Sequence, residues 1–500
     1  MDSKKSPGID MIRTKDLKDD QQLAELLRDI MNNSLNTSTI PNLMKVAVIR
    51  PIYKSGKHCE TTNYRPICIL NSTEKILETI IHTQLTNYLQ TNQIIKKQQY
   101  GFQKNKSAES CLEQFTQYMN YQLHLNKQIF VLYIDFSKAF DVLSHTLILS
   151  SLSQIGIQGK ELDWFRDYLT NRRATVRLND VVGDCKAWKF GVPQGSKIGP
   201  ILYILATNRI PDMIKDGEIF MFADDIAITT TSDNAESASK KMKSLIRLVQ
   251  KLTHDLGLVI NVTKTKVMHI RNRGPKYSLT KFIYHTHECL HKNDFEVCTC
   301  DTTIDMTEEH KYLGLVIDSR LTWQIHIDDI GKKIRAASAV IQKLKYNLPQ
   351  KTLKTIYYAL VESVINYGID AWHATTNEYT KKLQLTQNRI IKTMLSNKFN
   401  KKYKNINEKY EHANILTIEN LYRFKIIKNK YFYYLQKEEN ERDGYNLRVK
   451  RDKIPLTFNK YGERLNENRI PKIFNEIPVK LKRLTKIGDV KKQIKKWLLK

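Results

Sequence analysis

The sequence predicts an α+β fold with a long helical C-terminal part, and three stretches of the chain lead to this prediction. Residues 129–135, IFVLYID, form an unbroken apolar run that ends in an acid, as expected of a buried strand. Residues 217–231, GEIFMFADDIAITTT, place two apolar arms around an acidic tip, which is typical of a β-hairpin. From about residue 336 onward the pattern is helical and then increasingly polar and basic.

The part before residue 129 is expected to contain helices around a strand. A helical stretch near residues 23–31 precedes the strand-like run MKVAVIRPIYK at residues 44–54. Asn71 lies three residues before Glu74, which indicates a helix N-cap. The helix that follows has apolar residues near helical spacing, namely Ile76, Ile80, Leu85 and Leu89.

Between the strand and the acidic hairpin, the sequence predicts two short helices, one of which ends at Gly156. Residues 173–182, RATVRLNDVV, indicate a second hairpin, and the Gly-rich turn GVPQGSKIGP at residues 191–200 leads into an apolar helix. After the acidic hairpin, Asp233 is placed to cap a helix that ends at Gly257. The apolar face of that helix consists of Met242, Leu245, Val249, Leu252 and Leu256.

Size and charge restrict the class of protein. The chain has 500 residues, of which 41% are hydrophobic, and only 18 Gly and 12 Pro, so it is globular with several subdomains. It carries 81 Lys+Arg against 52 Asp+Glu, a net charge of +29, and residues 341–500 account for +21 of this excess. A polyanion, with nucleic acid as the first choice, is the expected partner.

Seven cysteines are too few for a disulfide scaffold in a chain of this length and indicate a reducing compartment. There is no apolar run of about eighteen residues and no apolar segment behind the polar N-terminus. We therefore expect neither a membrane span nor a secretory signal, and we expect the protein in the nucleus and cytoplasm.

Three acids are the strongest candidates for chemistry. Asp135 ends the predicted buried strand, and Asp224 and Asp225 lie in the hairpin turn about ninety residues later. Adjacent acids in a turn repel each other unless a cation neutralises them. Carboxylate oxygens favour Mg²⁺, and a pair of such ions is the usual device for nucleotidyl transfer. The basic C-terminal part makes nucleotidyl transfer the expected reaction.

At these residues the sequence resembles the reverse transcriptases, and among them the enzymes of non-LTR (LINE-type, jockey-like) retrotransposons. The central segments that carry the resemblance are YIDFSKAFD, GVPQGSKIGP, FADD, LGLVINVTKTK and KYLG. Upstream segments are KSPGID, PIYKSGK, NYRPI and QYGF, and downstream ones are YALVESVINYGIDAWHA, LQLTQNRIIK and RIPKIFNEIPVKLK. The resemblance covers nearly the whole chain, and so many segments in the right order are specific.

The resemblance implies a right-hand polymerase with fingers at residues 1–128, a palm at 129–320, a helical thumb at 321–400 and a basic C-terminal region at 401–500. It implies RNA-templated DNA synthesis, in which dNTPs are added to the 3′-hydroxyl of a DNA primer or nicked target DNA. The metal would be Mg²⁺ as two ions, with Mn²⁺ as a possible substitute.

The resemblance also assigns roles to residues. Asp135, Asp224 and Asp225 would hold the metal ions, and Lys54 and Arg65 would hold the incoming triphosphate. The other residues assigned to nucleotide binding are Phe136, Phe140, Gln194, Gly195 and Lys264. Phe140 would exclude a ribose 2′-hydroxyl, Gly195 would let the backbone approach the nucleotide, and Lys264 would assist the leaving pyrophosphate. Each of these residues also has a plain structural interpretation, as a core aromatic, a turn residue or a solvated cation.

Alternatives remain at two levels. The chain could be a catalytically inactive nucleic-acid-binding remnant of a retroelement, or a reverse transcriptase of the mobile-intron kind. The segment HTHECLHKNDFEVCTC at residues 285–300 holds ligands suited to zinc, but its spacing matches no standard pattern, and an exposed β-hairpin is expected there. Relatives of the resembled kind carry an endonuclease ahead of the polymerase, and KSPGID lies so near Met1 that we expect none in this chain.

Overall fold

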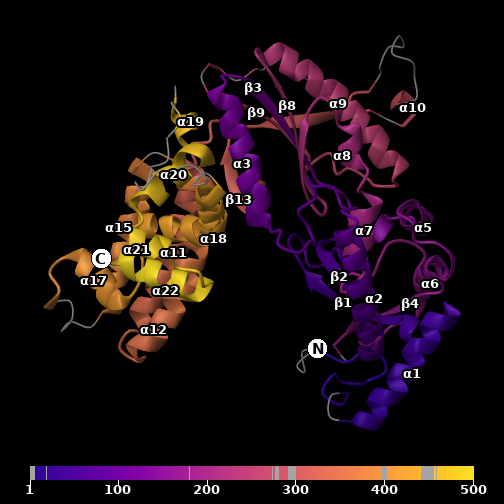
Figure 1. The fold of residues 1–500 in the computed structure, drawn as a ribbon. Helices are drawn as coiled ribbons and strands as arrows, with labels where there is room; N and C mark the ends of the chain where they lie inside the picture. Colours follow the sequence, from indigo (N-terminus) through magenta and orange to yellow (C-terminus); the bar gives the residue numbers. More distant parts are fainter. Residues whose placement is uncertain are drawn as a thin grey trace.

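The computed structural model describes residues 6–17, 20–179, 181–272, 274–275, 277, 281–285, 287–290, 300–375, 377–395, 402–440, 455, 457 and 459–500. Figure 1 shows an arch in which the six-stranded sheet joins an N-terminal arm to a helical C-terminal arm. The three parts correspond to fingers, palm and thumb, so the predicted right-hand architecture is confirmed. No helix in the described part of the chain is both long and apolar enough to cross a bilayer.

The fingers contain a five-stranded sheet with neighbouring helices. The strands are β1 (Val46–Tyr53), β2 (Tyr64–Ile69), β4 (Arg173–Leu178), β5 (Val181–Val182) and β6 (Lys186–Ala187). The helices are α1 (Gln21–Thr37), η1 (Asn42–Lys45), η2 (Thr61–Asn63), α2 (Ser72–Thr91), α5 (His145–Gln154) and α6 (Gly159–Leu169). β1 pairs antiparallel with β2 and parallel with β4, where Val46 lies opposite Arg173. Residues 173–187 therefore complete the fingers sheet although they follow the first palm strand.

The palm sheet has the strand order β10-β11-β9-β3-β8-β7. Its strands are β3 (Gln128–Ile134), β7 (Glu218–Phe222), β8 (Asp225–Ser232), β9 (Lys266–Ile270), β10 (Phe282–Ile283) and β11 (Thr303–Thr307). Other palm elements are α3 (Ala108–His124), α4 (Ala139–Val142), α7 (Gly199–Ala206), α8 (Ile210–Met213), α9 (Ala235–Asp255), α10 (His287–Leu290), β12 (Glu309–Tyr312) and β13 (Leu315–Asp318). The last two strands form a separate hairpin.

The central strand β3 is buried on both faces, as its unbroken apolar run predicts. Ile129, Val131 and Tyr133 belong to a core shared with α3 and the thumb. Phe130, Leu132 and Ile134 belong to a second core shared with α7 and α9. Alternate side chains of a strand point to opposite faces, so a strand covered on both faces has no polar side.

The thumb and the C-terminal region form one helical unit. Its first part comprises α11 (Gln324–Leu344), α12 (Gln350–Tyr357), the π-helical turn η3 (Tyr358–Glu362), α13 (Ser363–Asn366), α14 (Ile369–Trp372), α15 (Asn377–Met394) and α17 (Ile406–Ala413). Its second part comprises α18 (Ile418–Asn440), α19 (Lys460–Glu463), α20 (Asn466–Glu476), α21 (Val479–Lys482) and α22 (Ile487–Leu498). Tyr461, Phe474 and Ile494 are buried in the same core as Ile327 and Ile390.

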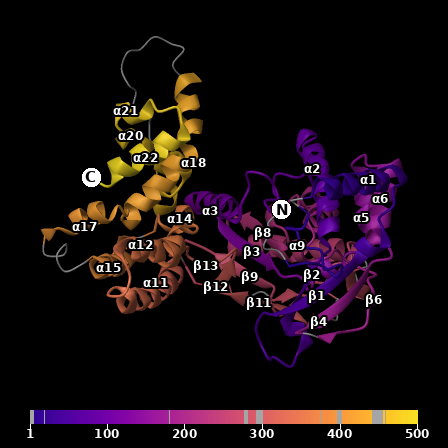
Figure 2. The same ribbon diagram turned by 90° about the horizontal axis from the view of Figure 1, so that it is seen from below.

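Helix α3 joins this unit to the palm. Its Phe115 packs edge-on against Phe220 of β7, with ring centroids 5.3 Å apart. On the C-terminal side, Gln117 accepts a hydrogen bond from the Asn466 backbone at 2.6 Å, and the Lys425 ammonium donates to Glu109. Figure 2 shows α3 between the palm sheet and the C-terminal helices. The sequence placed α3 with the fingers, ahead of a boundary at residue 128, whereas its packing associates it with the palm.

Two predicted helix starts are corrected in detail. α2 begins after Asn71, but the Asn71 amide donates to the Leu43 carbonyl at 2.6 Å and makes no capping bond to its own helix. α9 is capped by Asn234, which accepts from the Ser237 backbone at 2.8 Å. The predicted cap, Asp233, instead forms an ion pair with Lys127 at 2.6 Å.

Candidate active site

The three acids lie at one end of the palm sheet. In the β7–β8 hairpin, Phe222 pairs with Asp225, so Ala223 and Asp224 form a two-residue turn. Ala223 adopts a left-handed φ of 56°, as tight hairpin turns require. Ile134, the last residue of β3, pairs with Ile226 of β8, and Asp135 follows it. The register therefore brings Asp135 beside Asp225, although the two are far apart in the sequence.

Burial and neighbouring negative charges raise the pKa values of Asp224 and Asp225. Loss of hydration, repulsion from Asp224 and repulsion from Asp135 together raise the pKa of Asp225 to about 6. The pKa of Asp224 is also raised, first by loss of hydration and then by the charge of Asp135. The negative charges of these acids are only partly neutralised by the positive charges around them. Such a set of oxygen ligands suits a hard divalent cation.

Two cations of the fingers act on the same acids. Lys54 follows β1 and Arg65 lies on β2, and both side chains are exposed. Their positive charges lower the pKa of Asp224 and so partly offset its rise. The antiparallel pairing of β1 and β2 places Arg65 opposite Ile52, two residues before Lys54. Both predicted triphosphate ligands thus lie near enough for their charges to act on Asp224.

The segment between α9 and β9 contacts Asp135 through both its side chain and its backbone. The Lys264 ammonium lies 3.9 Å from the Asp135 carboxylate. The Asp135 backbone N–H donates to the Thr265 hydroxyl at 3.2 Å, and the Asn261 N–H donates to the Asp135 carbonyl at 2.8 Å. A cavity of about 570 Å³ opens beside these residues and is lined by Asp135, Asp225, Lys264, Lys266 and Lys311, among others. Anionic phosphates would meet both lysines and carboxylates in this cavity.

Phe136 and Phe140 lie in different environments. The Phe136 side chain is buried in the core beneath the sheet, so only its backbone is available to a nucleotide. Phe140 is half-buried, with its ring centroid 4.5 Å from that of Tyr203 and 6.5 Å from that of Phe102. Burial raises the pKa of Tyr203, and the charges of Asp224 and Asp225 raise it further. This aromatic group therefore lies near the acids.

The turn at residues 193–197 packs against the fingers. Gln194 donates from its side chain to Asp141 at 2.8 Å and accepts from the Cys68 N–H at 2.7 Å through its carbonyl. Gly195 has a φ of 130°, and a Cβ at this position would lie 2.5 Å from the Cys68 carbonyl oxygen. The glycine is therefore required first for close approach to β2, which also carries Arg65. Its role toward a nucleotide remains a prediction.

Sequence reasoning missed Gln99, which supports the acidic turn. Gln99 is 2% exposed, and its side-chain oxygen accepts hydrogen bonds from the N–H groups of Gly101 at 2.8 Å and Ala223 at 3.0 Å. The neighbouring backbone adds a bond from the Tyr100 N–H to the Met221 carbonyl at 2.7 Å. The segment QYGF carries part of the resemblance, but nothing local in the sequence indicates a contact across more than one hundred residues.

Comparison with known proteins identifies the family of this chain. The family model described as "Reverse transcriptase (RNA-dependent DNA polymerase)" matches residues 52–317, which is more than half of the chain. The chain is 26% identical to the probable RNA-directed DNA polymerase from transposon BS of Drosophila melanogaster, over 78% of this chain and 43% of the relative. It is also 26% identical to the RNA-directed DNA polymerase from mobile element jockey of the same species, over 78% of this chain and 42% of the relative. The chain thus spans about two fifths of the length of these relatives.

Among solved structures, the chain is similar to telomerase from Candida albicans in complex with a TWJ fragment of telomeric RNA. The TM-score is 0.41 and the identity 11%, over 79% of this chain and 71% of that chain.

Proposed function

Because the chain belongs to the reverse transcriptase (RNA-dependent DNA polymerase) family, we propose that it extends a DNA primer with dNTPs on an RNA template. Three carboxylates gathered at one end of the palm sheet and acted on by two cations of the fingers carry this proposal. Nucleotidyl transfer needs negative charges that bind metal cations and positive charges that bind a triphosphate, and these residues supply both.

The family uses divalent metal ions, and the donor set of this chain fits Mg²⁺. Asp135 and Asp224 would hold the ions, with Asp225 as a further ligand or support. When bound, two ions would make the primer hydroxyl more acidic and neutralise charge on the leaving pyrophosphate. The raised pKa values of Asp224 and Asp225 reflect the negative charge that such ions would offset.

The chain's own residues would position the nucleotide. Lys54 and Arg65 would donate to the triphosphate from the fingers, as charge-assisted hydrogen bonds to phosphate are strong. Lys264, already paired with Asp135, would hold a proton near the pyrophosphate. Phe140 would lie against the sugar, backed by Tyr203, and thereby exclude a 2′-hydroxyl.

The partners in this proposal are an RNA template and a DNA primer or nicked target DNA. The net charge of +21 in residues 341–500 would attract the phosphates of both. Tyr433, 70% exposed on α18, is available to stack on a base. Tyr410 and Tyr431, two other aromatic residues of the basic C-terminal region, are buried and belong to the hydrophobic core. The basic run LRVKRDK lies outside the described residues.

The test is primer extension on an RNA template with Mg²⁺ and dNTPs. We expect incorporation by the wild-type chain and a loss of several orders of magnitude in Asp224→Asn, because the variant lacks one metal-binding charge. RNA binding by the variant should stay nearly unchanged. Asp216→Asn, an exposed acid ahead of β7, is the matched control and should retain activity.

Two results would contradict the proposal. Incorporation by Asp224→Asn within tenfold of wild type would remove the carboxylates from the chemistry. No incorporation by wild type with either Mg²⁺ or Mn²⁺, together with tight RNA binding, would favour the inactive remnant.

A further inference from the structure

A second group of metal-binding side chains lies at the far edge of the palm sheet from β7. His285 follows β10, Cys300 precedes β11, and Cys289 lies on the short helix α10 between them. β10 and β11 pair antiparallel, with Ile283 opposite Thr303, and the Tyr284 N–H donates to the Thr302 carbonyl at 2.8 Å. This register brings His285 and Cys300 together at the end of the strand pair where the connecting segment begins and ends, which the sequence spacing alone did not reveal.

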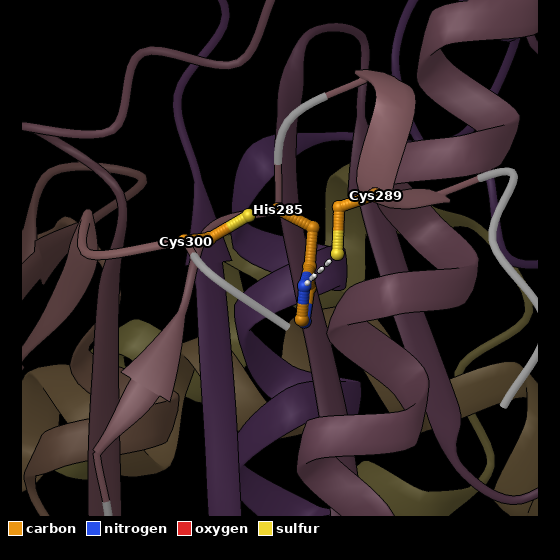
Figure 3. A group of neighbouring side chains, drawn as sticks. All are labelled: His285, Cys289 and Cys300. Carbon is orange, nitrogen blue, oxygen red and sulfur yellow. Dashed lines mark hydrogen bonds between the residues drawn. The ribbon is translucent and has the colours of Figure 1, made fainter. Parts of the chain in front are cut away.

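The ligand atoms of the three side chains lie within 4.8 Å of one another. The Cys289 sulfur is 3.4 Å from Nδ1 of His285, and Figure 3 shows it directed at the imidazole ring. Tetrahedral zinc, with bonds of about 2.3 Å to sulfur and 2.0–2.1 Å to nitrogen, requires such atoms to be roughly 3.5–3.8 Å apart. The other two separations, which are within 4.8 Å, exceed this range by no more than about 1 Å. These three described side chains are therefore close enough to share one ion.

Helix α9 fixes the backbone that carries two of these ligands. Gln250, 4% exposed, accepts from the His285 N–H at 3.3 Å and donates to the His285 carbonyl at 3.3 Å. Arg247, one turn earlier, donates to the Cys289 carbonyl at 3.4 Å. Cys289 itself is 7% exposed. Hydrogen bonds of this kind orient metal ligands and are part of a built site.

We propose that His285, Cys289 and Cys300 bind one Zn²⁺ ion that links the two ends of the segment between β10 and β11. Two thiolates and an imidazole are soft and borderline ligands, which favour zinc over the Mg²⁺ suited to the carboxylates. The fourth position would be taken by solvent or by another side chain. His287, His291 and Cys298 belong to the same segment, but their side chains lie outside the described residues.

The role of this ion would be structural. In the palm sheet, β9 and β11 lie between β3, which ends just before Asp135, and β10, which leads to His285. The proposed ion is therefore separate from the carboxylate site and does not depend on the proposed polymerase activity. It would join His285 to Cys300 and so tie β10 to β11 beyond their two-residue pairing.

The test uses the full chain, purified in reductant and equilibrated with Zn²⁺ alone, followed by gel filtration and metal analysis by mass spectrometry. We expect about one tightly held zinc per chain in wild type and its loss in Cys289→Ser and Cys300→Ser. Cys59→Ser and Cys185→Ser are matched controls and should retain the ion. Gln250→Leu should weaken zinc affinity about 10- to 100-fold, because it removes the support of His285.

Cobalt supplies a second readout that does not require a variant. Co²⁺ bound to wild type should show a thiolate-to-cobalt charge-transfer band whose intensity indicates two sulfur ligands. Equal zinc contents in wild type and in a Cys289→Ser, Cys300→Ser double variant would overturn the proposal. So would a cobalt spectrum without that band, or a Cys289–Cys300 disulfide found by peptide mapping of the reduced preparation.

Discussion

Burial and the charges of Asp224 and Asp135 raise the pKa of Asp225. Its pKa of about 6 means that the folded chain binds a proton more readily than the unfolded chain, whose aspartate has a pKa near 3.8. Protonation of Asp225 therefore stabilises the folded state, and this contribution is lost as pH rises from about 4 through about 6. A cation at the acids would offset that loss above pH 6.

This behaviour gives a prediction for metal binding. Below pH 6 protons compete for Asp225, so the apparent Mn²⁺ affinity should fall by up to about tenfold per pH unit, as measured by electron paramagnetic resonance titration. In EDTA the free energy of unfolding should decrease as pH rises through the same window. Asp225→Asn should remove much of both dependences, and unchanged profiles in that variant would assign the titration to other groups.

Phe140 gives a second prediction at the residue scale. Phe140→Val should raise the use of rNTPs relative to dNTPs, because it removes the ring that lies between Tyr203 and Phe102. A steric effect on the order of 1–3 kcal/mol corresponds to roughly 5- to 150-fold in the ratio of kcat/KM values. Phe190→Val, at a ring 59% exposed on the surface, is the control. An unchanged ratio would show that Phe140 is only part of the core.

Among the elements, the acidic hairpin depends on a segment outside it. Gln99 accepts from the Ala223 N–H, and a Cβ on Gly101 would lie 2.6 Å from that same nitrogen. The QYGF segment and the turn are therefore packed backbone to backbone. This contact fixes the position of Asp224 without adding a group to the chemistry.

We therefore expect Gln99→Met to lower incorporation at least tenfold, because it leaves two buried N–H groups without their acceptor, at about 1–3 kcal/mol each. Gln99→Glu keeps an acceptor and should retain the thermal stability that Gln99→Met loses. A purely structural role would lower stability and leave kcat of the folded fraction unchanged. Steady-state kinetics, measured at a temperature at which both variants are fully folded, distinguishes these outcomes.

Local patterns in the sequence predict the helices and strands better than they predict which helix face is buried or which residue caps a helix. The apolar residues of α2 predicted a face through Ile76 and Ile80, whereas Leu77 and Ile81 are the buried ones, together with the predicted Leu85 and Leu89. Asn71 and Asp233 have the right side chains for capping, but tertiary partners engage them elsewhere. Palm strand β3 was predictable because burial on both faces leaves an unbroken apolar run in the sequence.

For the whole molecule, the carboxylates were predictable because acids after apolar strands are conspicuous. The contact between the C-terminal helices and the palm was not predictable, because the residues that form it are far apart in the sequence and belong to no conspicuous pattern. Gln117 donates to the Arg464 carbonyl at 3.2 Å, and Arg464 donates to the Leu321 carbonyl at 2.8 Å. The zinc ligands were likewise hidden, because a strand register rather than a sequence interval brings them together.

The basic region is best tested by charge removal, because deleting residues 459–500 would also remove core residues such as Tyr461 and Phe474. The exposed α22 lysines Lys491, Lys492 and Lys496 offer such a change. Their joint replacement by Gln should weaken RNA binding and reduce the slope of log K against log salt by about 2, at roughly 0.7 per single-strand phosphate contact.

The control replaces three exposed palm lysines, Lys243, Lys251 and Lys281, by Gln. Equal slopes for the two triple variants would show that the C-terminal charge acts only through the overall field. Fluorescence anisotropy on labelled RNA over a salt series provides the measurement.

The position of α3 between the palm sheet and the C-terminal helices has a consequence for synthesis of the chain. The palm side of α3 finds its partners soon after translation, but Asn466, which contacts Gln117, emerges 349 residues later. At about 5–20 residues per second this delay is roughly 20–70 s. Throughout that interval the part of α3 that α19 and α20 later cover stays exposed to solvent. Chaperone occupancy on ribosome-bound chains should therefore be highest before residue 459 is exposed and should fall once α19 and α20 cover the helix.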